Sequence, residues 1–341
     1  MKLSIIIPCY RVEKYIRKCL DSVLSIPLND SEYEVICFED CAPDNTPTIL
    51  DDYVYRYKNV KIVHSAVNVG PGGGRNQALK NAIGKYVWFV DADDMVIPDV
   101  VPSLLNQAEA NHLDVLIFDY QDINECENIL PKGYNMKDTC VMHGDEIANL
   151  AFEGGLVNNM GYPWRFLIKR EYLCQNRIVF PENMIYGEDT VWMGNVVLFA
   201  ERIQASSKCA YLYWHHETST CGIMNKYYPG RTIYERCILT AKQLFDFVEE
   251  LKDRQSPNLE VYAAQIDFFA RNHYVNQLPI MMGRTSRQER RIFYVMWKAH
   301  TCIKIKQRAN FITQILLMPI YGCIFADLFA VYYKLTHRKY R

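Results

Sequence analysis

Short apolar runs alternate with amphipathic segments along the first hundred residues of the chain. The runs are rich in β-branched and aromatic residues, which predicts buried strands, and the segments between them have helical spacing. The predicted strands are residues 3–8, 33–40, 60–65 and 86–91, and the predicted helices are residues 12–25, 46–57 and 74–82. Strands that alternate with helices are typical of βαβ units, so this part of the chain predicts an α/β fold with a parallel sheet.

The pattern is less regular after residue 100 and becomes helical throughout from about residue 228 to 308. The elements predicted before that region are a helix over 103–111, strands over 114–123 and 209–216, a polar stretch over 122–142, and helices beginning near Asp145 and Glu188. These changes divide the chain into four predicted regions: residues 1–115, 116–222, 223–308 and 309–341.

The last of these regions differs in character from the rest. Residues 311–333 are nearly all apolar, and basic residues flank them on both sides. A membrane-spanning helix needs about 20 apolar residues, but Pro319, Gly322 and Asp327 interrupt this run. We therefore predict that residues 309–341 form an amphipathic tail that lies on a membrane surface. A buried terminal helix and a true span are the alternatives.

Composition limits the classes of protein to which the chain can belong. Its 341 residues are half hydrophobic and carry a net charge of −1, which predicts a globular protein and argues against a nucleic-acid partner. Twelve cysteines include no C-x-x-C pair, so we expect reduced thiols in a cytosolic setting rather than structural zinc or a disulfide framework. The N-terminal apolar run is too short for a signal peptide and ends at Pro8.

Three carboxylates lie at the end of the strand predicted over residues 86–91: Asp91 is its last residue, and Asp93 and Asp94 follow it. Ligands of open α/β sheets bind where such strands end. Carboxylates this close repel one another and raise each other's pKa unless a cation such as Mg²⁺ or Mn²⁺ neutralises them. The sequence therefore predicts a divalent metal site, with a helix N-cap cluster as the alternative.

Two further loops carry polar residues at predicted strand ends. Asp40 ends the second strand, where it could accept hydrogen bonds from a nucleobase or ribose, whereas a turn and helix cap alone would explain Asp44. The run from Gly70 to Gly74, which includes Gly72, precedes Arg75 and opens a helix, so it could approach a phosphate closely. Arg75 occupies the third glycine position of a dinucleotide motif, which argues against a nicotinamide cofactor. We expect Arg75 to neutralise phosphate or to form a helix-surface salt bridge.

Four segments, "SIIIPCYRVEKYIRKCLDSVL", "EDCAPDNT", "NVGPGGGRNQAL" and "GKYVWFVDADDMVIPD", resemble in order and spacing the family 2 glycosyltransferases of bacterial polysaccharide synthesis. The resemblance is strong over residues 1–115 and looser at "GEDTVW" and "YLYWHHETST". It implies the GT-A fold, a Rossmann-like, mostly parallel sheet flanked by helices, with a helical C-terminal region. Residues 1–115 would bind a nucleotide-sugar and residues 116–222 would form the acceptor and catalytic subdomain.

The resemblance also implies a donor-binding role for several positions. The segment from Pro8 to Tyr10 matches the part that lies under the nucleotide. Asp40 matches the carboxylate that holds the base, usually uracil, and Asp44 its neighbour. Gly72 and Arg75 fall on the glycine-rich segment that would border the ribose or phosphates. The implied donor is a nucleotide-diphosphate sugar, with a UDP-sugar favoured.

The metal positions follow from the same resemblance. Asp91, Ala92 and Asp93 match the D-x-D motif, in which the first carboxylate lies near ribose and metal and the second is a direct ligand of Mn²⁺ or Mg²⁺. His215 or His216 falls where some GT-A enzymes place a histidine on the metal or pyrophosphate, and His215 is our predicted ligand.

Asp189, with Glu188 beside it, matches the catalytic base of inverting members of the family. The implied function is a metal-dependent, inverting transfer of a sugar to a hydroxyl of a glycan or lipid-linked acceptor, at the cytoplasmic face of the membrane. Whether the protein is a homodimer is left open. One alternative is a non-catalytic, membrane-attached nucleotide-sugar-binding subunit. A haloacid-dehalogenase-like phosphatase is disfavoured because its D-x-D motif lies on the opening strand.

The chain departs from the family pattern at two loops. Arg11 stands where the family commonly has Asn, and Cys41 stands second in a loop that commonly reads Asp-Gly-Ser. These departures leave the base contacts and the donor preference open.

Overall fold

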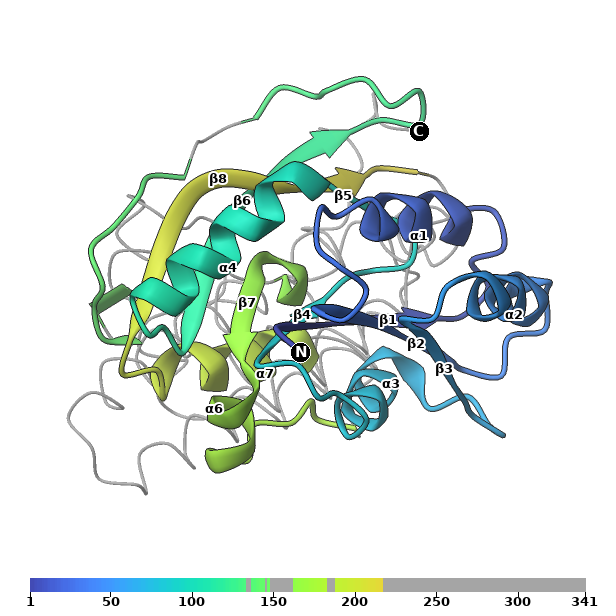
Figure 1. Ribbon diagram of the computed structural model, residues 1–341, viewed down its shortest axis with the longest axis horizontal. Helices are drawn as coiled ribbons and strands as arrows, with labels where there is room; N and C mark the ends of the chain where they lie inside the picture. The colour runs from blue at the N-terminus through green and yellow to red at the C-terminus, as the bar shows by residue number, and fades with distance from the viewer. Residues whose placement is uncertain (133–135, 145, 148–161, 183–187, 217–341) are drawn as a thin grey trace, which may run out of the picture. The chain divides into compact units, whose positions relative to one another are not determined.

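The computed structural model describes residues 1–132, 136–144, 146–147, 162–182 and 188–216, which belong to one compact unit (Figure 1). Most of the helix predicted near Asp145, the predicted helical region 223–308 and the predicted tail 309–341 lie outside these residues. No helix among the described residues has the length and apolar character needed to cross a membrane.

One sheet runs through the described unit, in the strand order β3-β2-β1-β4-β7-β6-β8-β5. Its strands are β1 (Leu3–Cys9), β2 (Tyr33–Glu39), β3 (Val60–His64), β4 (Tyr86–Phe89), β5 (Met95–Val96), β6 (Val115–Ile123), β7 (Phe166–Lys169) and β8 (Ile203–Trp214). Only β7 and β5 run against the others, so the predicted mostly parallel sheet is confirmed. The sheet continues without a break across residue 115, the predicted subdomain border.

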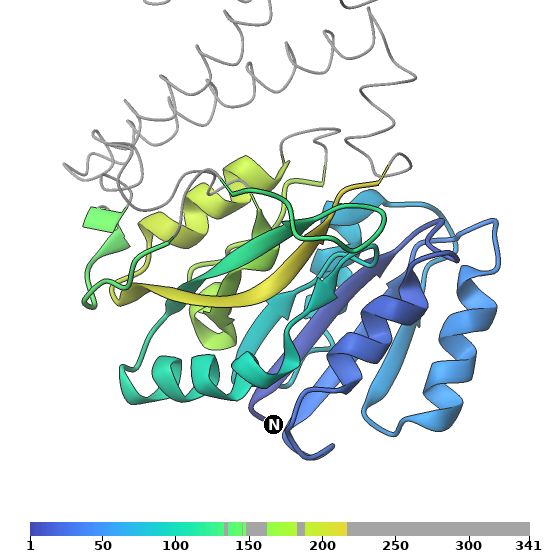
Figure 2. The same cartoon turned by 90° about the horizontal axis from the view of Figure 1, so that it is seen from above.

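Helices cover both faces of the sheet (Figures 1 and 2). They are α1 (Ile16–Leu24), α2 (Thr46–Arg56), α3 (Gly70–Leu79), α4 (Val101–Ala110), α6 (Arg170–Gln175) and α7 (Glu188–Leu198), with short 3₁₀ turns at Pro98–Val100 and Pro163–Arg165. Apolar side chains of α1, α2 and α4 join one core, and those of α3, α6 and α7 join a second core on the opposite face. Burial of these two cores is the main stabilising contribution to the fold.

The structure corrects two predicted boundaries and adds a strand that was not predicted. Helix α3 begins at Gly70 rather than at residue 74, so the glycines lie inside the helix. Strand β8 begins at Ile203 rather than at residue 209, and the two polar residues Ser207 and Lys208 fall where its register with β6 shifts. Strand β7 was not predicted, because four residues carry too little periodicity.

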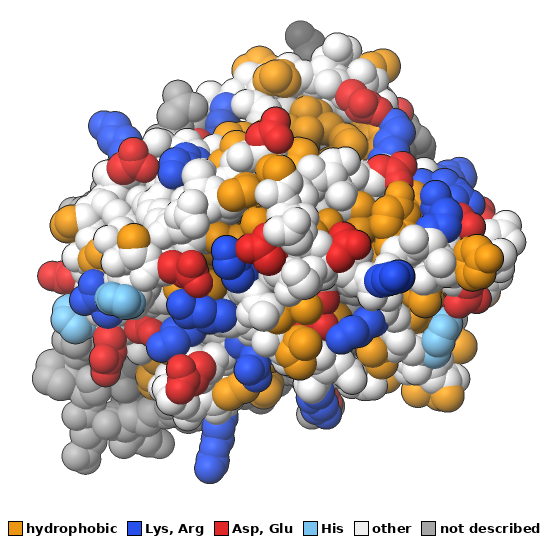
Figure 3. Space-filling view, in the orientation of Figure 1, with side chains coloured by type: hydrophobic (Ala, Val, Ile, Leu, Met, Phe, Trp, Pro, Cys, Tyr) orange, Lys and Arg blue, Asp and Glu red, His pale blue; other side chains and the backbone are white. Residues whose placement is uncertain are grey.

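Several chain segments meet at the carboxyl ends of the parallel strands. The loops that follow β1, β2 and β4 leave the sheet at this edge, since those strands are neighbours and run in one direction. Arg75 of α3 and the first residues of α7 also reach this edge, through the ion pairs described below. Charged side chains of both signs are interspersed over the face drawn in Figure 3, in keeping with the small net charge.

Candidate active site

Asp94, the third carboxylate after β4, is a structural residue. Its side chain is buried, and it accepts hydrogen bonds from the Tyr211 hydroxyl and the Trp214 backbone N–H, both at 2.7 Å. The Tyr211 oxygen in turn accepts the backbone N–H of Asp91 at 3.1 Å. Burial raises the pKa of Asp94 well above its usual value, although the two hydrogen bonds oppose that rise. Asp94 therefore ties the D-x-D loop to β8.

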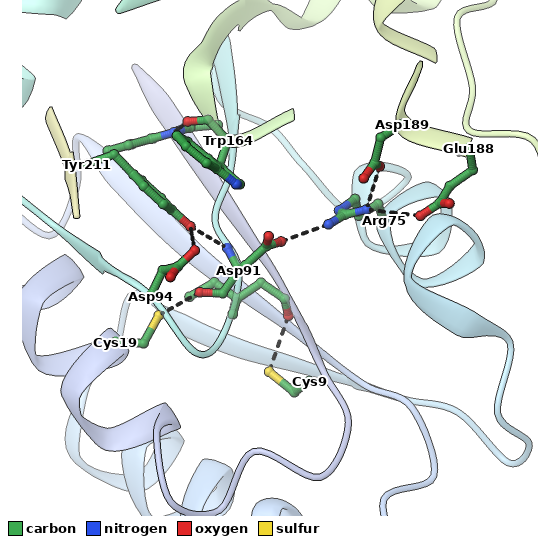
Figure 4. A network of polar contacts seen from close by, with 11 residues as sticks. Cys9, Cys19, Arg75, Asp91, Asp94, Trp164, Glu188, Asp189 and Tyr211 are labelled. Carbon is green, nitrogen blue, oxygen red and sulfur yellow. Dashed lines mark hydrogen bonds and ion pairs between the residues drawn. The ribbon is translucent and has the colours of Figure 1, made fainter. Parts of the chain in front are cut away.

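Arg75 joins the D-x-D motif to the Glu188–Asp189 pair (Figure 4). The guanidinium donates to Asp91 Oδ1 at 2.7 Å and to Asp189 Oδ1 at 3.1 Å, and Glu188 Oε1 lies 3.9 Å away. Only 4% of Arg75 is exposed, so this is a buried bridge rather than a helix-surface salt bridge. Residues far apart in the sequence are thereby brought to one site, as the family resemblance predicts.

The charges around Arg75 do not balance. Burial lowers the pKa of Arg75, but the neighbouring carboxylates outweigh it and the pKa lies above its usual value. Burial raises the pKa of Asp189 to about 8, against the opposing effect of Arg75. The pKa of Asp91 is also raised, chiefly by burial. Within the part of the chain that the structure describes, one guanidinium therefore faces three carboxyl groups.

The two histidines that follow β8 bind different carboxylates. His216 Nε2 lies 3.1 Å from Asp93 Oδ2, and its ring packs 4.2 Å from that of Tyr15. His215 Nε2 lies 2.7 Å from Asp122 Oδ1 on β6. Both histidines follow β8, which ends at Trp214, and the His215 backbone N–H donates to the Ile123 carbonyl oxygen of β6. Their side chains bind different partners, and only that of His216 reaches the D-x-D motif. The structure places His216 there, not the predicted ligand His215.

Asp40 caps the N-terminus of α3. Its two carboxylate oxygens accept the backbone N–H groups of Val69 and Gly70 at 2.7 and 2.9 Å. Burial raises its pKa, and these hydrogen bonds oppose the rise. Asp44 likewise accepts backbone N–H groups, from Glu13 at 3.3 Å and from Thr46. A protein carboxylate thus occupies the helix terminus at which the sequence predicted phosphate.

The glycines of α3 allow close packing rather than an open phosphate cradle. A Cβ atom at Gly74 would lie 2.7 Å from the Phe38 ring, and one at Gly72 would lie 3.3 Å from Glu188 Cγ. Glycine at these positions lets α3 approach β2 and the start of α7. This is the main correction to the glycine-rich segment as a ligand-binding element.

The two departures from the family pattern share one backbone conformation. Arg11 and Cys41 both have φ 55°, in the left-handed region, and they lie in the loops after β1 and β2. Asn and Gly, the residues common in the family, adopt this region most readily. The two loops therefore keep the conformation that the family pattern predicts, although the residues differ. Tyr10, beside Arg11, is 40% exposed at this edge.

Asn76 is a further residue of the site that the sequence did not indicate. It is buried on α3, next to Arg75, and makes two hydrogen bonds to the backbone of Phe180. No local pattern reports a contact between residues 104 positions apart.

The side chains present fit a hard divalent cation. No three His, Cys, Asp or Glu side chains among the described residues are grouped closely enough to hold a metal by themselves. Mg²⁺, however, is commonly bound by one or two carboxylates together with substrate phosphates. Asp91 and Asp93 are carboxylates of this kind, and the surplus negative charge around Arg75 favours a cation.

Named glycosyltransferases resemble the chain over up to two thirds of its length. The poly(ribitol-phosphate) beta-glucosyltransferase of Bacillus spizizenii is 32% identical over 214 residues, which cover 62% of this chain and 32% of that protein. The uncharacterized glycosyltransferase EpsJ of Bacillus subtilis is 30% identical over 225 residues, 66% of this chain and 64% of that protein. The chain thus spans less than two thirds of the length of these curated relatives.

Solved structures share the fold. Staphylococcus aureus TarS 1–349 in complex with UDP-GlcNAc has a TM-score of 0.71 at 22% identity, covering 100% of this chain and 93% of that chain. The mannosyltransferase PcManGT from Pyrobaculum calidifontis, in complex with GDP-Man and Mn²⁺, has a TM-score of 0.51 at 14% identity, covering 99% of this chain and 88% of that chain. The predicted GT-A fold is confirmed by the match to TarS.

The family is established by a sequence model of its members. The model described as "Glycosyl transferase family 2" matches residues 4–186, just over half of the 341-residue chain. That match removes the haloacid-dehalogenase-like alternative. The chain belongs to glycosyl transferase family 2.

Proposed function

We propose that the protein is a metal-dependent, inverting glycosyltransferase that moves a sugar from a UDP-sugar to a hydroxyl of a glycan or lipid-linked acceptor. One observation carries the proposal: Arg75 holds Asp91 of the D-x-D motif and Asp189 at one site, within 2.7 and 3.1 Å of its guanidinium. A donor diphosphate and an attacking hydroxyl must meet in this way, since one carboxylate serves the leaving group and another serves the nucleophile.

The donor would lie over the carboxyl ends of β1, β2 and β4. Asp40 and the segment from Pro8 to Tyr10 border this edge, in the positions that the family resemblance assigns to the nucleotide. TarS, which shares the fold, is known in complexes with UDP and UDP-GlcNAc, and this supports a uridine nucleotide.

Asp91 and Asp93 would hold the divalent cation, with His216 beside Asp93. A bound cation would stabilise the negative charge that develops on the leaving diphosphate. Asp189 would accept the proton of the acceptor hydroxyl as its oxygen forms a bond to the anomeric carbon and the bond to the diphosphate breaks. Burial raises the pKa of Asp189 to about 8, which suits a group that must bind a proton near neutral pH.

The acceptor and the cellular location are part of the proposal. One relative is named for poly(ribitol-phosphate), which supports a polymeric or glycan acceptor. Residues 309–341 would hold the protein at the cytoplasmic face of a membrane, where confinement raises the effective concentration of a lipid-linked acceptor.

Calorimetric titration tests the donor site. UDP, GDP and dTDP are titrated into the full chain with and without Mn²⁺, and UDP is repeated on Asp93→Ala. We expect UDP to bind in a Mn²⁺-dependent way and to lose at least tenfold in affinity in the variant. Asp52→Ala, an exposed carboxylate on α2 that pairs with Arg56, is the matched control and should bind UDP like the wild type. Absence of nucleotide binding under every metal condition would refute the donor site.

Measurement of UDP-sugar consumption distinguishes a glycosyltransferase from a non-catalytic nucleotide-sugar-binding subunit. If UDP binds but no UDP-sugar is consumed, either by transfer or by hydrolysis, the protein is a nucleotide-sugar-binding partner. The presence of both Asp93 and Asp189 favours catalysis.

A further inference from the structure

Asn76 clamps the backbone of Phe180, eight residues before Glu188. Its Nδ2 donates to the Phe180 carbonyl oxygen at 2.8 Å, and its Oδ1 accepts the Phe180 backbone N–H, also at 2.8 Å. Nδ2 also donates to Glu182 Oε1 at 3.1 Å. Only 6% of Asn76 is exposed, so no water competes freely for these bonds. Two bonds to one residue fix both its position and its rotation relative to α3.

The Phe180 side chain links the backbone held by Asn76 to α7 and Arg75. Its ring stacks on that of Trp192 in α7, with centroids 4.2 Å apart and planes 8° apart. The Arg75 guanidinium lies 5.2 Å from the centroid of the same ring. Phe180 is therefore in contact with the helix that bears Asp189 and with the arginine that binds Asp189.

We propose that Asn76 is a positioning residue for the reaction. Through Phe180 it sets the place of Arg75 and the orientation of α7, and hence the position of Asp189 relative to Asp91. The inference rests on the proposed function, because it assigns to Asn76 a role in placing the base. Asn76 makes no hydrogen bond to Asp91 or Asp189, so its effect is indirect.

The expected signature is a loss of rate without a loss of donor affinity. A misplacement of about 1 Å in a catalytic group can lower the rate about 10²-fold. Donor binding depends on the D-x-D loop and the loops after β1 and β2, whereas the hydrogen bonds of Asn76 go to Phe180 and Glu182. A purely structural role would instead lower stability and leave the rate of the folded fraction unchanged.

Asn76→Ala is compared with Ser4→Ala in the full chain. Ser4 is a matched control, because it is buried at the opposite end of the sheet and also makes two hydrogen bonds, donating to Glu34 and accepting from the Gly84 N–H. We expect Asn76→Ala to lower kcat about 30- to 100-fold and to change the UDP-sugar KM less than about twofold. Ser4→Ala should lose a comparable amount of thermal stability and keep its kcat.

Hydrogen exchange gives a second readout that does not require activity. Backbone amides of residues 178–182 and 188–198 should exchange faster in Asn76→Ala, whereas those of β1 should not. If Asn76→Ala does not fold, Phe180→Leu tests the same path, since it keeps the backbone bonds and removes the ring stack; it should show the same fall in kcat.

The outcomes separate the two claims. Equal kcat in the Asn76 and Ser4 variants, or unchanged exchange in α7, would overturn the positioning role. If the wild-type chain turns over no UDP-sugar, the proposed function fails; the exchange of α7 then decides by itself whether Asn76 positions the helix.

Discussion

The carboxylates at the two ends of the parallel strands differ in how completely the protein pairs them. At the amino end, Glu34 of β2 accepts hydrogen bonds from Ser4 Oγ at 2.6 Å, Lys61 Nζ at 2.7 Å and Ile83 N–H at 2.8 Å. Burial raises the pKa of Glu34, but these partners outweigh burial and the pKa lies below its usual value. This carboxylate is fully paired within the protein.

At the carboxyl end, the carboxylates outnumber their partners. Among the described residues, Arg75 is the cation that pairs with Asp91, Glu188 and Asp189, and the pKa values of Asp91 and Asp189 lie above the usual range because burial outweighs the arginine. A carboxylate whose pKa the folded protein lowers contributes stability at neutral pH, whereas a strongly raised pKa marks a candidate functional group. The comparison therefore separates the stabilising end of the sheet from the end at which we propose the active site, called the functional end below.

The largest effect should come from the functional end. In Asp189→Asn we expect kcat to fall about 10³-fold, because an amide cannot accept the acceptor proton. Stability should stay the same or rise, since Asn is neutral without binding the proton that Asp189 must hold in the folded state below its pKa of about 8. Steady-state kinetics and urea unfolding measure the two quantities.

Asp122→Asn is the matched control for this variant. Asp122 pairs with His215 rather than with Arg75, and its loss should leave kcat within about twofold. Full activity in Asp189→Asn would mean that another residue is the base. It would also contradict the assignment of catalysis to the carboxyl end of the strands.

The stabilising end should give the reverse result. In Glu34→Gln one carboxylate oxygen becomes an NH₂ group that faces a hydrogen-bond donor, which should lower the free energy of unfolding by about 2–3 kcal/mol. The kcat of the folded protein should not change.

Glu109→Gln provides the comparison for Glu34. Glu109 pairs with Lys85 at 3.1 Å near the protein surface, and such pairs contribute about 0.2–1 kcal/mol. If Glu34→Gln were no more destabilising than Glu109→Gln in denaturant unfolding, the hydrogen bonds of Glu34 would not be the source of stability inferred here.

The sequence predicts the local elements of the fold better than it predicts the long-range contacts of the site, for a physical reason. The strands β1 to β4 and the helices between them were predicted, because each pattern lies within one short stretch of chain. The family motifs predicted Asp91 and Asp189 as site residues, but the bridge through Arg75 joins residues 114 positions apart and has no periodicity of its own. Asn76 was missed for the same reason.

The choice between the two histidines shows the same limit. Neighbouring residues of a strand point to opposite faces, so a shift of one position moves a side chain to the other face. The register that places His216 beside Asp93 depends on the bulge between β6 and β8, which lies before the end of β8 and has no signal in the sequence.

The pH dependence of stability should have opposite signs at the two ends. The folded pKa of Asp189 is about 8, well above the value of about 3.9 for an unfolded chain. Between these values the folded state holds a proton that the unfolded state has lost, so this group lowers stability as pH rises from about 4 to 8. Glu34 has a lowered folded pKa, so its contribution is present above about pH 4.3 and is lost as pH falls.

Urea unfolding from pH 5 to 8.5 tests this difference. The free energy of unfolding of the wild type should decline with pH, and Asp189→Asn should remove part of the decline, the remainder coming from Asp91, Asp94 and Asp40. Glu34→Gln should leave the slope unchanged over this range. A wild-type slope that Asp189→Asn does not alter would mean that Asp189 is ionised in the folded protein throughout the range.

The smallest effect concerns backbone strain at the functional end. Cys41, with φ 55°, lies in the left-handed region, where a side chain costs about 1–2 kcal/mol. Glycine removes this cost, but its greater conformational freedom in the unfolded chain destabilises the folded protein by about 0.5–1 kcal/mol. Cys41→Gly should therefore raise the free energy of unfolding by about 0.5–1 kcal/mol. Cys126→Gly, an exposed cysteine without positive φ, should lower it by a similar amount. If both substitutions were destabilising, the loop after β2 would not be strained, and Cys41 would be favoured there by a contact of its side chain.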